Sequence, residues 1–425
     1  MREMKDSGIE WIGQIPKDWD VVPHKRVMHK VKKICEQYSG EDIISLTMNG
    51  VIKRDLTAGG KMPTSFDGYQ YVKPNDLLLC LFDIDVTPRC VGVVKDYGVT
   101  SPAYSRFVMH DGYYNAYYDY LLRAIDDDKV FVHLSKNLRS SLTESDFGAI
   151  KTCVPSLAEQ KRIVTFLDAQ CAEIDTVLEK TRASIEEYKK LKQAVITQAV
   201  TKGIRGDRPM KDSGIEWIGD IPAEWEIKRI KNICSLKTGS TPSTGNAEWF
   251  NGDLLWFTPG DFNEKFVLLS SNRTLSRTAG KDGVATMIPA NSVLVVCIGG
   301  SAGKVGYTNY GCSCNQQITA LCKSNIMPKL LMYDVNAGMP FLRNTTMFTT
   351  LPILNNQAIG GLVLPIPREE EQLSIIEYLD EKCAGIDALI AKKQQYLTEI
   401  ENYKKSLIYE YVTGKKEVKT SVLAD

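Results

Sequence analysis

One glycine-rich segment of this 425-residue sequence has residue types that could bind phosphate. Residues 299–304 read Gly-Gly-Ser-Ala-Gly-Lys and follow residues 292–298, an apolar run typical of a buried strand. A P-loop would need glycine in place of Ile298 and a hydroxyl residue in place of Val305, so a Mg²⁺ ligand is missing. We therefore expect the backbone amides of this turn, with Lys304, to contact a phosphate of DNA rather than a nucleotide.

No other pattern of catalytic or metal-binding residues is recognisable in the sequence. The 11 cysteines include no C-x-x-C pair and the 4 histidines are not at metal-ligand spacing, so we expect reduced thiols and no metal site. Asp261 and Lys265 have the residue types of a metal-dependent nuclease but the wrong spacing. The motifs of base-flipping methyltransferases are also missing. The sequence thus predicts no catalytic residue and no cofactor in this chain.

Turn-rich stretches in both halves contain polar and aromatic side chains that could read DNA bases. Side-chain amides bind adenine bidentately, arginine or lysine binds guanine, and hydroxyl groups adapt to either. The DNA-binding candidates in the first half are Lys53, Arg54, Tyr69, Ser101, Tyr104 and Arg106. Those in the second half are Thr241, Ser243, Arg277, Ser301, Lys304, Asn315, Gln316 and Gln317. Any one residue of these types is more often an ordinary loop or core residue than a DNA contact.

An internal repeat organises the whole chain. Residues 4–16 recur as residues 210–222 with a single difference, Gln14 against Asp220, and a matching tryptophan follows each copy. Near the end of each half, the pairs Glu-Gln, Leu-Asp, Cys-Ala, Ile-Asp and Val-Thr recur at matching positions. The segments between these repeats barely resemble each other. The halves therefore share a frame and differ in the parts that are free to face a ligand.

The second repeat of each half predicts a long helix, over residues 156–203 and 367–415. Apolar side chains recur there every three or four residues over several heptads, a narrow stripe that favours a coiled coil. The residues expected to pair the helices are Leu167, Cys171, Ile174, Leu178, Ile185, Leu379, Cys383, Ile386, Ile390, Leu397 and Ile400. Two amphipathic helices packed on separate domains are the alternative.

The length of these helices decides their expected orientation. A helix of about 45 residues is roughly 68 Å long at 1.5 Å per residue, whereas the link over residues 203–210 spans at most about 25 Å. An antiparallel pair needs no return of the chain along the helix. We therefore expect the two globular segments at opposite ends of an antiparallel pair, related by an approximate two-fold axis.

These patterns together predict an α+β fold. It has two α/β domains separated by two long antiparallel coiled-coil helices, with a pseudo-two-fold internal repeat. The predicted boundaries are residues 1–155 for the first globular domain, 156–203 for the first helix, 204–366 for the second globular domain, 367–415 for the second helix and 416–425 for a C-terminal tail.

Charge and hydropathy limit the classes of partner that this chain can have. The formal net charge is zero, which argues mildly against nucleic-acid binding and leaves open a coiled-coil adaptor that binds only proteins. Basic residues outnumber acidic ones in residues 226–365 but not in residues 20–155. No apolar run is long enough to span a membrane, and the charged first residues are unlike a secretion signal. We expect a cytoplasmic protein with no membrane partner.

The sequence resembles the specificity subunits of type I restriction–modification systems over essentially its whole length. The resemblance is carried by residues 5–13 and their repeat 211–219, and by residues 237–243, 249–256, 299–304, 315–316 and 412–415. Pro155 and Pro367, each followed by a Glu-Gln pair, are similar to the start of the family's helical conserved regions. The first globular segment matches least specifically.

The resemblance implies that each globular segment is a target recognition domain that reads one half of a bipartite, asymmetric DNA site. The helices would set the distance between the halves and dock two methyltransferase subunits, and two restriction subunits would complete the complex. S-adenosylmethionine, ATP and Mg²⁺ would belong to these partners, so the assembly, and not this chain, would methylate and cleave DNA. The alternatives are a fused DNA methyltransferase or nuclease and the adaptor without DNA binding.

Overall fold

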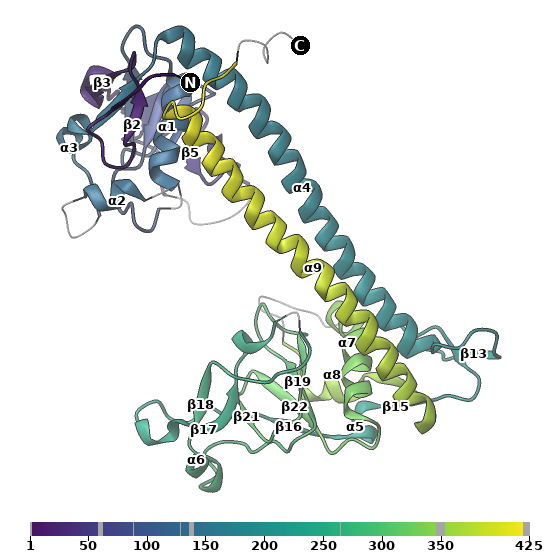
Figure 1. The fold of residues 1–425 in the computed structure, drawn as a ribbon. Coiled ribbons are helices and arrows are strands. Elements are labelled where there is room, and N and C mark those ends of the chain that lie inside the picture. The colour runs from purple at the N-terminus through teal and green to yellow at the C-terminus, as the bar shows by residue number, and fades with distance from the viewer. Residues whose placement is uncertain are drawn as a thin grey trace. The chain divides into compact units, whose positions relative to one another are not determined.

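The chain forms two compact units that each contain part of both long helices (Figure 1). The first unit comprises Met1–Arg182 and Gln395–Asp425, and the second comprises Ala183–Gln394. The computed structural model describes residues 2–57, 63–87, 89–127, 129–135, 140–263, 265–345 and 353–419. Of the predicted C-terminal tail, residues 420–425 lie outside this part of the chain. Both units mix helices and strands, which confirms the predicted α+β class.

A four-stranded antiparallel sheet of order β4-β11-β8-β9 forms the centre of the first unit. Its strands are Met28–Lys30, Ser105–Met109, Leu77–Leu79 and Val91–Val93. Around it lie the antiparallel pairs β1 and β2 (Met4–Asp6, Gln14–Pro16), β3 and β12 (Asp20–Pro23, Lys151–Val154), β5 and β6 (Ile44–Thr47, Gly50–Lys53), and β7 and β10 (Gln70–Val72, Gly98–Thr100).

Three helices and a short 3₁₀ turn complete the core of the first unit. They are α1 (Asn115–Asp127), α2 (Val130–Leu134), α3 (Glu144–Ala149) and η1 (His24–Arg26). Leu77 and Leu79 of β8 and the aromatic rings of Tyr117, Phe131 and Phe147 are fully buried together. Burial of these large side chains provides most of the free energy that holds the sheet and helices together.

The second unit repeats this plan with longer strands. A four-stranded antiparallel sheet has the order β16-β22-β19-β20, with strands Ser235–Thr238, Ile318–Cys322, Ser292–Val296 and Val305–Thr308. A three-stranded sheet has the order β18-β17-β21, with strands Arg273–Leu275, Phe250–Phe257 and Ser313–Cys314. The paired strands β13 and β14 are Met210–Asp212 and Asp220–Pro222, and β15 and β23 are Glu226–Arg229 and Val363–Ile366.

The helices of the second unit are α5 (Ile230–Ile233), α6 (Arg277–Lys281), α7 (Pro328–Thr345) and α8 (Asn356–Gly361), with 3₁₀ turns at Ala247–Trp249 and Pro259–Asp261. Every residue of β19 is buried, as expected for the apolar run at residues 292–298. This strand lies between β20 and β22 and places the glycine-rich turn at its end.

The two long helices are α4 (Leu157–Lys202) and α9 (Glu369–Val412). Each is followed by a glycine in the left-handed region, Gly203 and Gly414, both with φ of 72°. Only glycine adopts this conformation without strain, which explains where the helices end. Among the described helices, none combines the length and apolar character that a membrane span requires.

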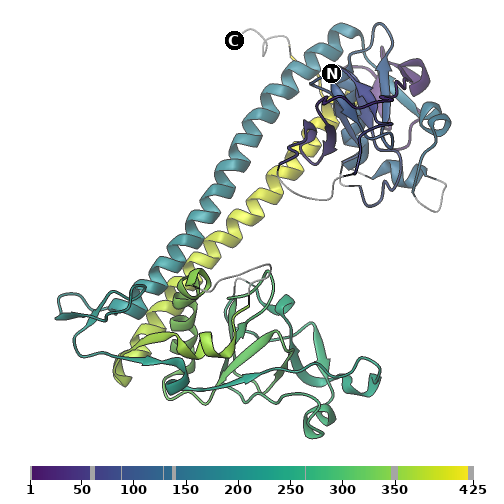
Figure 2. The same cartoon turned by 180° about the vertical axis from the view of Figure 1, so that it is seen from behind.

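The two helices run antiparallel within each unit (Figures 1 and 2). In the first unit, Lys404 of α9 contacts Asp175 of α4 at 2.6 Å. In the second unit, Lys192 of α4 contacts Asp387 of α9 at 2.8 Å. Of the predicted pairing residues, Ile174, Leu397 and Ile400 are half-buried. The others are buried: Leu167, Cys171, Leu178, Ile185, Leu379, Cys383, Ile386 and Ile390.

The opening hairpin of each unit packs on the C-terminal end of a long helix. In the first unit, Lys415 donates hydrogen bonds to the carbonyl oxygens of Ile12 and Gln14 at 2.7 and 2.6 Å, and the Tyr409 hydroxyl donates to the carbonyl of Trp11 at 2.9 Å. In the second unit, Lys202 donates to a carbonyl of the β13–β14 hairpin. Each repeated hairpin is thus tied to a helix end.

Candidate nucleic-acid interface

Four polar segments of the second unit meet at one edge of its main sheet. We call residues 238–244, 299–304 and 314–317 with Asn356 the second-unit loop cluster. The Ser240 amide donates to the Cys314 carbonyl at 2.9 Å. A Cβ atom on Gly239 would lie 2.2 Å from the same carbonyl oxygen, so only glycine allows this approach. The backbone thus holds the first and third segments side by side.

Side chains of the loop cluster hydrogen-bond to one another and reach solvent. The exposed Thr241 hydroxyl donates to the side-chain oxygen of the exposed Gln316. The Asn315 side-chain amide donates to Gln317 Oε1 at 3.0 Å, and Asn315 is almost fully buried. Asn315 therefore orients Gln317, while the exposed Gln316 amide keeps donor capacity for a ligand.

Asn356 belongs to this cluster but was not among the residues predicted from the sequence. Its amide donates to the Thr238 hydroxyl at 2.9 Å and its carbonyl accepts from the Thr319 hydroxyl at 2.8 Å. The residue lies far along the chain from the loops that it joins. No local pattern marks an isolated asparagine at a helix start as part of a distant loop cluster.

The glycine-rich turn satisfies much of its own hydrogen bonding. The amides of Ala302, Gly303 and Lys304 donate to backbone carbonyls at 2.9, 2.8 and 3.1 Å. The Lys304 ammonium group donates to the carbonyl of Phe262 at 3.0 Å, although the side chain is exposed. Ser301 is half-buried at the tip. Lys304 can reach a phosphate only by leaving the Phe262 carbonyl, so the turn is a weaker phosphate site than the sequence suggested.

Two other candidates of the second unit lie on its surface. Ser243 is exposed in the loop after β16. Arg277 begins α6, has 75% of its side chain exposed and contacts Asp253 at 2.8 Å. Nearby, the guanidinium of Arg273 lies over the rings of Phe250 and Trp256, 5.2 and 5.0 Å from their centres. An arginine held on aromatic rings has a fixed direction, which suits it to phosphate or base contacts.

The candidates of the first unit are distributed differently. Lys53, the last residue of β6, is exposed and contacts Asp42 at 2.7 Å, and the half-buried Arg54 directly follows the strand. Tyr69 packs in a small aromatic cluster with Phe66. Ser101 and Tyr104 are half-buried, and their carbonyls accept hydrogen bonds from the buried side-chain amide of Gln70.

Arg106 is buried, with 7% of its surface exposed. Its guanidinium contacts Asp76 at 2.6 Å and donates to the carbonyl of Tyr71 at 3.0 Å. These contacts join β11 to the turn before β8 and to β7. In this conformation Arg106 stabilises the fold of the first unit and has no free face for DNA.

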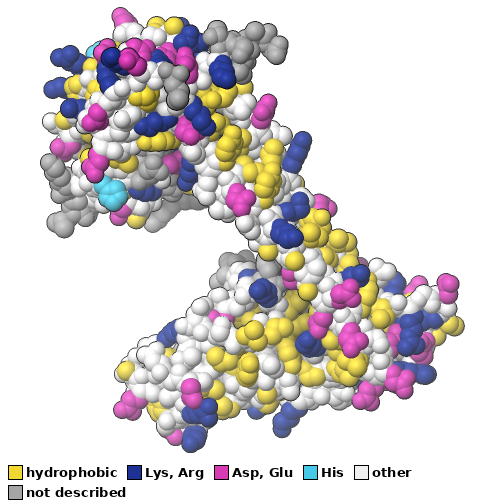
Figure 3. Space-filling view, in the orientation of Figure 1, with side chains coloured by type: hydrophobic (Ala, Val, Ile, Leu, Met, Phe, Trp, Pro, Cys, Tyr) yellow, Lys and Arg dark blue, Asp and Glu magenta, His cyan; other side chains and the backbone are white. Residues whose placement is uncertain are grey.

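A basic segment of the first unit was missed in the sequence. Residues 24–33 contain no acidic residue, and the exposed side chains are Lys25, Arg26, His29, Lys30, Lys32 and Lys33. Lys30 lies 3.6 Å from Glu144, and Lys33 lies over the ring of Tyr71. Dark blue side chains gather near β3 and α3 on the face drawn in Figure 3. Because acidic and basic residues balance over residues 20–155 as a whole, the net charge of this stretch does not reveal the basic segment.

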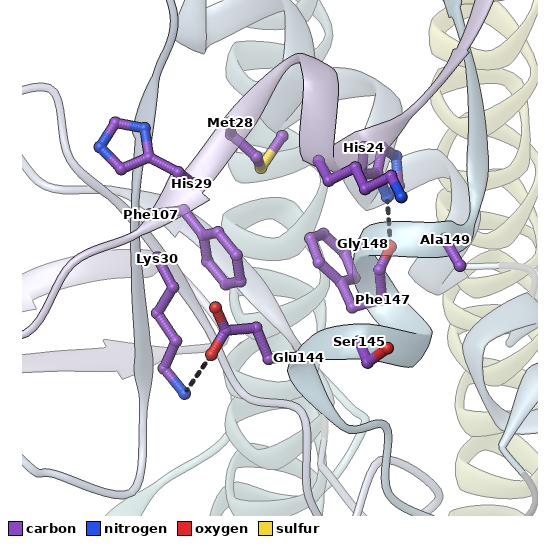
Figure 4. Close-up of a pocket in the computed structure, with 11 residues that line it drawn as sticks. His24, Met28, His29, Lys30, Phe107, Glu144, Ser145, Phe147, Gly148 and Ala149 are labelled. Carbon is purple, nitrogen blue, oxygen red and sulfur yellow. Dashed lines mark hydrogen bonds and ion pairs between the residues drawn. The ribbon is translucent and has the colours of Figure 1, made fainter.

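A pocket of about 330 Å³ lies beside the basic segment (Figure 4). Lys30 and Glu144 face each other at one side, and His29 turns away. His24 is fully buried, stacks on Phe147 with ring centres 4.6 Å apart and is within 3.3 Å of that residue's carbonyl. Burial lowers the pKa of His24 to about 4, so its ring is neutral at pH 7. His24 is thus a buried packing residue at the start of the basic segment.

Comparison with known proteins gives a consistent result. The family described as type I restriction modification DNA specificity domain matches residues 222–401. A protein of Methanocaldococcus jannaschii ascribed to the type I restriction enzyme MjaX as its specificity subunit is 24% identical, and the match covers 96% of each chain. The specificity subunit of the type I restriction enzyme MjaIX from the same organism is 28% identical over 39% of this chain and 40% of its own length.

The fold has a counterpart among solved structures. A chain in a structure that addresses the assembly and conformational transition of a type I restriction–modification system superposes with a TM-score of 0.70. The sequence identity is 16%, and the superposition covers 95% of this chain and 99% of the other. At this identity the likeness concerns the fold alone.

Proposed function

The chain belongs to the specificity subunits of type I restriction–modification systems, and from this premise we propose that its two units read the two halves of a bipartite, asymmetric DNA sequence. One observation carries the proposal. The two units share hairpins that differ at a single residue and similarly placed helix motifs, yet their exposed loops differ. A common frame with unlike loops suits a site whose two halves have different sequences.

In the second unit, the loop cluster is the base-reading surface. The Gln316 amide can pair bidentately with adenine, and Thr241 and Ser243 supply adaptable hydroxyls. Arg277 would contact phosphate, and so would Lys304 once its ammonium group leaves the Phe262 carbonyl. In the first unit, the basic segment at residues 24–33 neutralises phosphates, while Lys53, Arg54, Tyr69, Ser101 and Tyr104 remain the candidates for base contact.

The long helices act as a ruler between the two readers. A coiled-coil pair has a fixed rise per residue, so it sets a spacer of fixed length in the DNA that no side chain has to read. This role requires the two readers at opposite ends of the helix pair. The ion pairs between α4 and α9 within each unit support it, because they fix the register of the helices.

The same helices dock the other subunits. On the face drawn in Figure 3, hydrophobic side chains (yellow) interrupt the charged surface of the helices. The exposed apolar residues of α4 and α9 include Val177, Leu191, Leu389, Tyr396 and Tyr403. Two methyltransferase subunits and two restriction subunits would carry S-adenosylmethionine, ATP and Mg²⁺. This chain itself performs no catalysis.

A domain exchange tests the proposal. Residues 20–155 are replaced by the corresponding segment of another family member, and the chain is expressed with its methyltransferase subunit. Sequencing of the methylated genome should give a bipartite motif in which one half has changed. A change in both halves, or methylation without a bipartite motif, would overturn the proposal. Purified chain alone should neither methylate nor cleave DNA.

A further inference from the structure

Each unit has a groove beside the turn of its repeated hairpin. In the first unit, a groove of about 540 Å³ lies between residues 8–11 and α2, with Ile150 at its base. In the second unit, a groove of about 670 Å³ lies between residues 214–217 and the end of α7, with Leu362 at its base. Ile150 and Leu362 each directly precede the strand that leads to a long helix. The two grooves are therefore equivalent in the internal repeat.

The lining of both grooves is largely apolar and open to solvent. In the first groove, Leu134 of α2 has 38% of its surface exposed and Trp11 is half-buried. In the second, Trp217 and Ile215 are half-buried beside Phe341. Among the described residues that line the second groove, Glu216 alone is charged. Glu10 holds the same place in the first groove, which Lys151 also lines.

Packing explains most of the identity between the two hairpins. Asp6 accepts a hydrogen bond from the amide of Gly8 at 3.0 Å, and Asp212 accepts the equivalent one at 2.9 Å. Gly8 has φ of 66°, which favours glycine, and Ile12 is buried. Glu10 and Glu216 are different, because both are exposed and within the described residues neither has a hydrogen bond or an ion pair. The fold does not require a carboxylate at these positions.

We propose that each groove binds the same segment of a partner protein, an apolar side chain next to a lysine or arginine, so that one chain holds two copies of that partner. The unpaired carboxylate beside an apolar hollow gives the required charge complementarity. DNA cannot be the ligand, because a carboxylate repels phosphate and the two halves of the site differ. The identification of the partner as the methyltransferase subunit rests on the proposed function.

Charge reversal tests this proposal without disturbing the core. Full-length chains carrying Glu10→Arg, Glu216→Arg or both are titrated with the methyltransferase subunit of the same system, and the bound copies are counted by native mass spectrometry. Wild type should bind two copies. Each single variant should weaken one binding step at least tenfold, and the double variant should weaken both. The matched control is Glu417→Arg, an exposed residue outside the groove, which should bind as wild type does.

The possible results of this experiment test the groove and the proposed function separately. Two copies bound with wild-type affinity by the double variant would overturn the groove while leaving the specificity-subunit function intact. Absence of methyltransferase binding by the wild-type chain would contradict both the groove proposal and the proposed function. An equal loss in the Glu417→Arg control would show a general charge effect and would also overturn the groove. Thermal unfolding of each variant should match wild type, because both carboxylates are exposed.

Discussion

At the residue scale, the repeated motifs serve packing more than ligand binding. Trp19 donates through Nε1 to Glu159 at 3.0 Å, and Trp225 donates to Glu371 at 2.9 Å. An arginine also contacts each carboxylate, Arg2 in the first unit and Arg208 in the second. Both partners of the Glu159 carboxylate, Trp19 and Arg2, are distant from it in sequence, so no local motif could predict these contacts.

The buried His24 makes the first unit sensitive to acid. Its pKa is about 4 when folded against 6.5 when unfolded, so between these values the unfolded chain binds more protons. Stability is therefore retained above pH 6.5 and falls by about 3 kcal/mol as the pH approaches 4. Urea unfolding between pH 7 and 4 measures this slope. It should shrink in His24→Asn and persist in His133→Asn, and an unchanged slope in His24→Asn would contradict the assignment.

Gln316 should determine one position of the DNA sequence. Removing its amide in Gln316→Ala should relax the preference at one base pair of one half-site, at a cost of about 1–3 kcal/mol. Competition binding with single-base variants of the site provides the measurement. Gln395→Ala on α9 is the control and should leave all preferences unchanged. Loss of preference in both half-sites would contradict the role of the loop cluster.

At the element scale, the long helices were the most predictable part of the chain. The expected bounds 156–203 and 367–415 agree closely with α4 and α9, because heptad spacing and a following glycine are local signals. Lys192 is a polar residue within the apolar stripe of α4, and its place there has a physical cause. This side chain is buried but reaches Asp387 of the other helix. Such a polar pair fixes the register of two helices at some cost in stability.

The basic segment of the first unit should bind phosphate without reading sequence. Replacing Lys25, Arg26 and Lys32 with glutamine should weaken binding to every DNA sequence alike. Each lost phosphate contact should reduce the slope of log affinity against log salt by roughly 1. Fluorescence anisotropy across a salt series, with the methyltransferase subunit present, gives this slope. Lys419→Gln is the control, and a change in sequence preference would contradict a pure phosphate role.

The globular segments were less predictable than the helices. Most strands of the first unit have three or four residues, too short for an alternating pattern to stand out. Arg106 illustrates the consequence for the site. An arginine in a turn-rich stretch suggested DNA contact, but its partner Asp76 lies in another strand region and buries it. In the second unit, the structure brings Thr241, Asn315, Gln316 and Gln317 together, and their contact with DNA stays a prediction.

At the scale of the whole molecule, the internal repeat predicted two units of similar construction. If the helices act as a ruler, a change in their length should change the length of the DNA spacer. Inserting one heptad at matching points of α4 and α9 lengthens the helix pair by about 10 Å. The methylated motif should keep both half-sites and gain about three base pairs of spacer, at 3.4 Å per pair. Sequencing of the methylated genome detects this, and an unchanged spacer would contradict the ruler.

The hydrogen bonds from Tyr409 and Lys415 to the opening hairpin have a consequence for synthesis. The second unit is one continuous stretch of chain, so it can fold on the ribosome while translation continues. The first unit is discontinuous, and its hairpin lacks these donors until residue 415 has emerged. A nascent chain that stalls late would thus display a folded second unit joined to an incomplete first one.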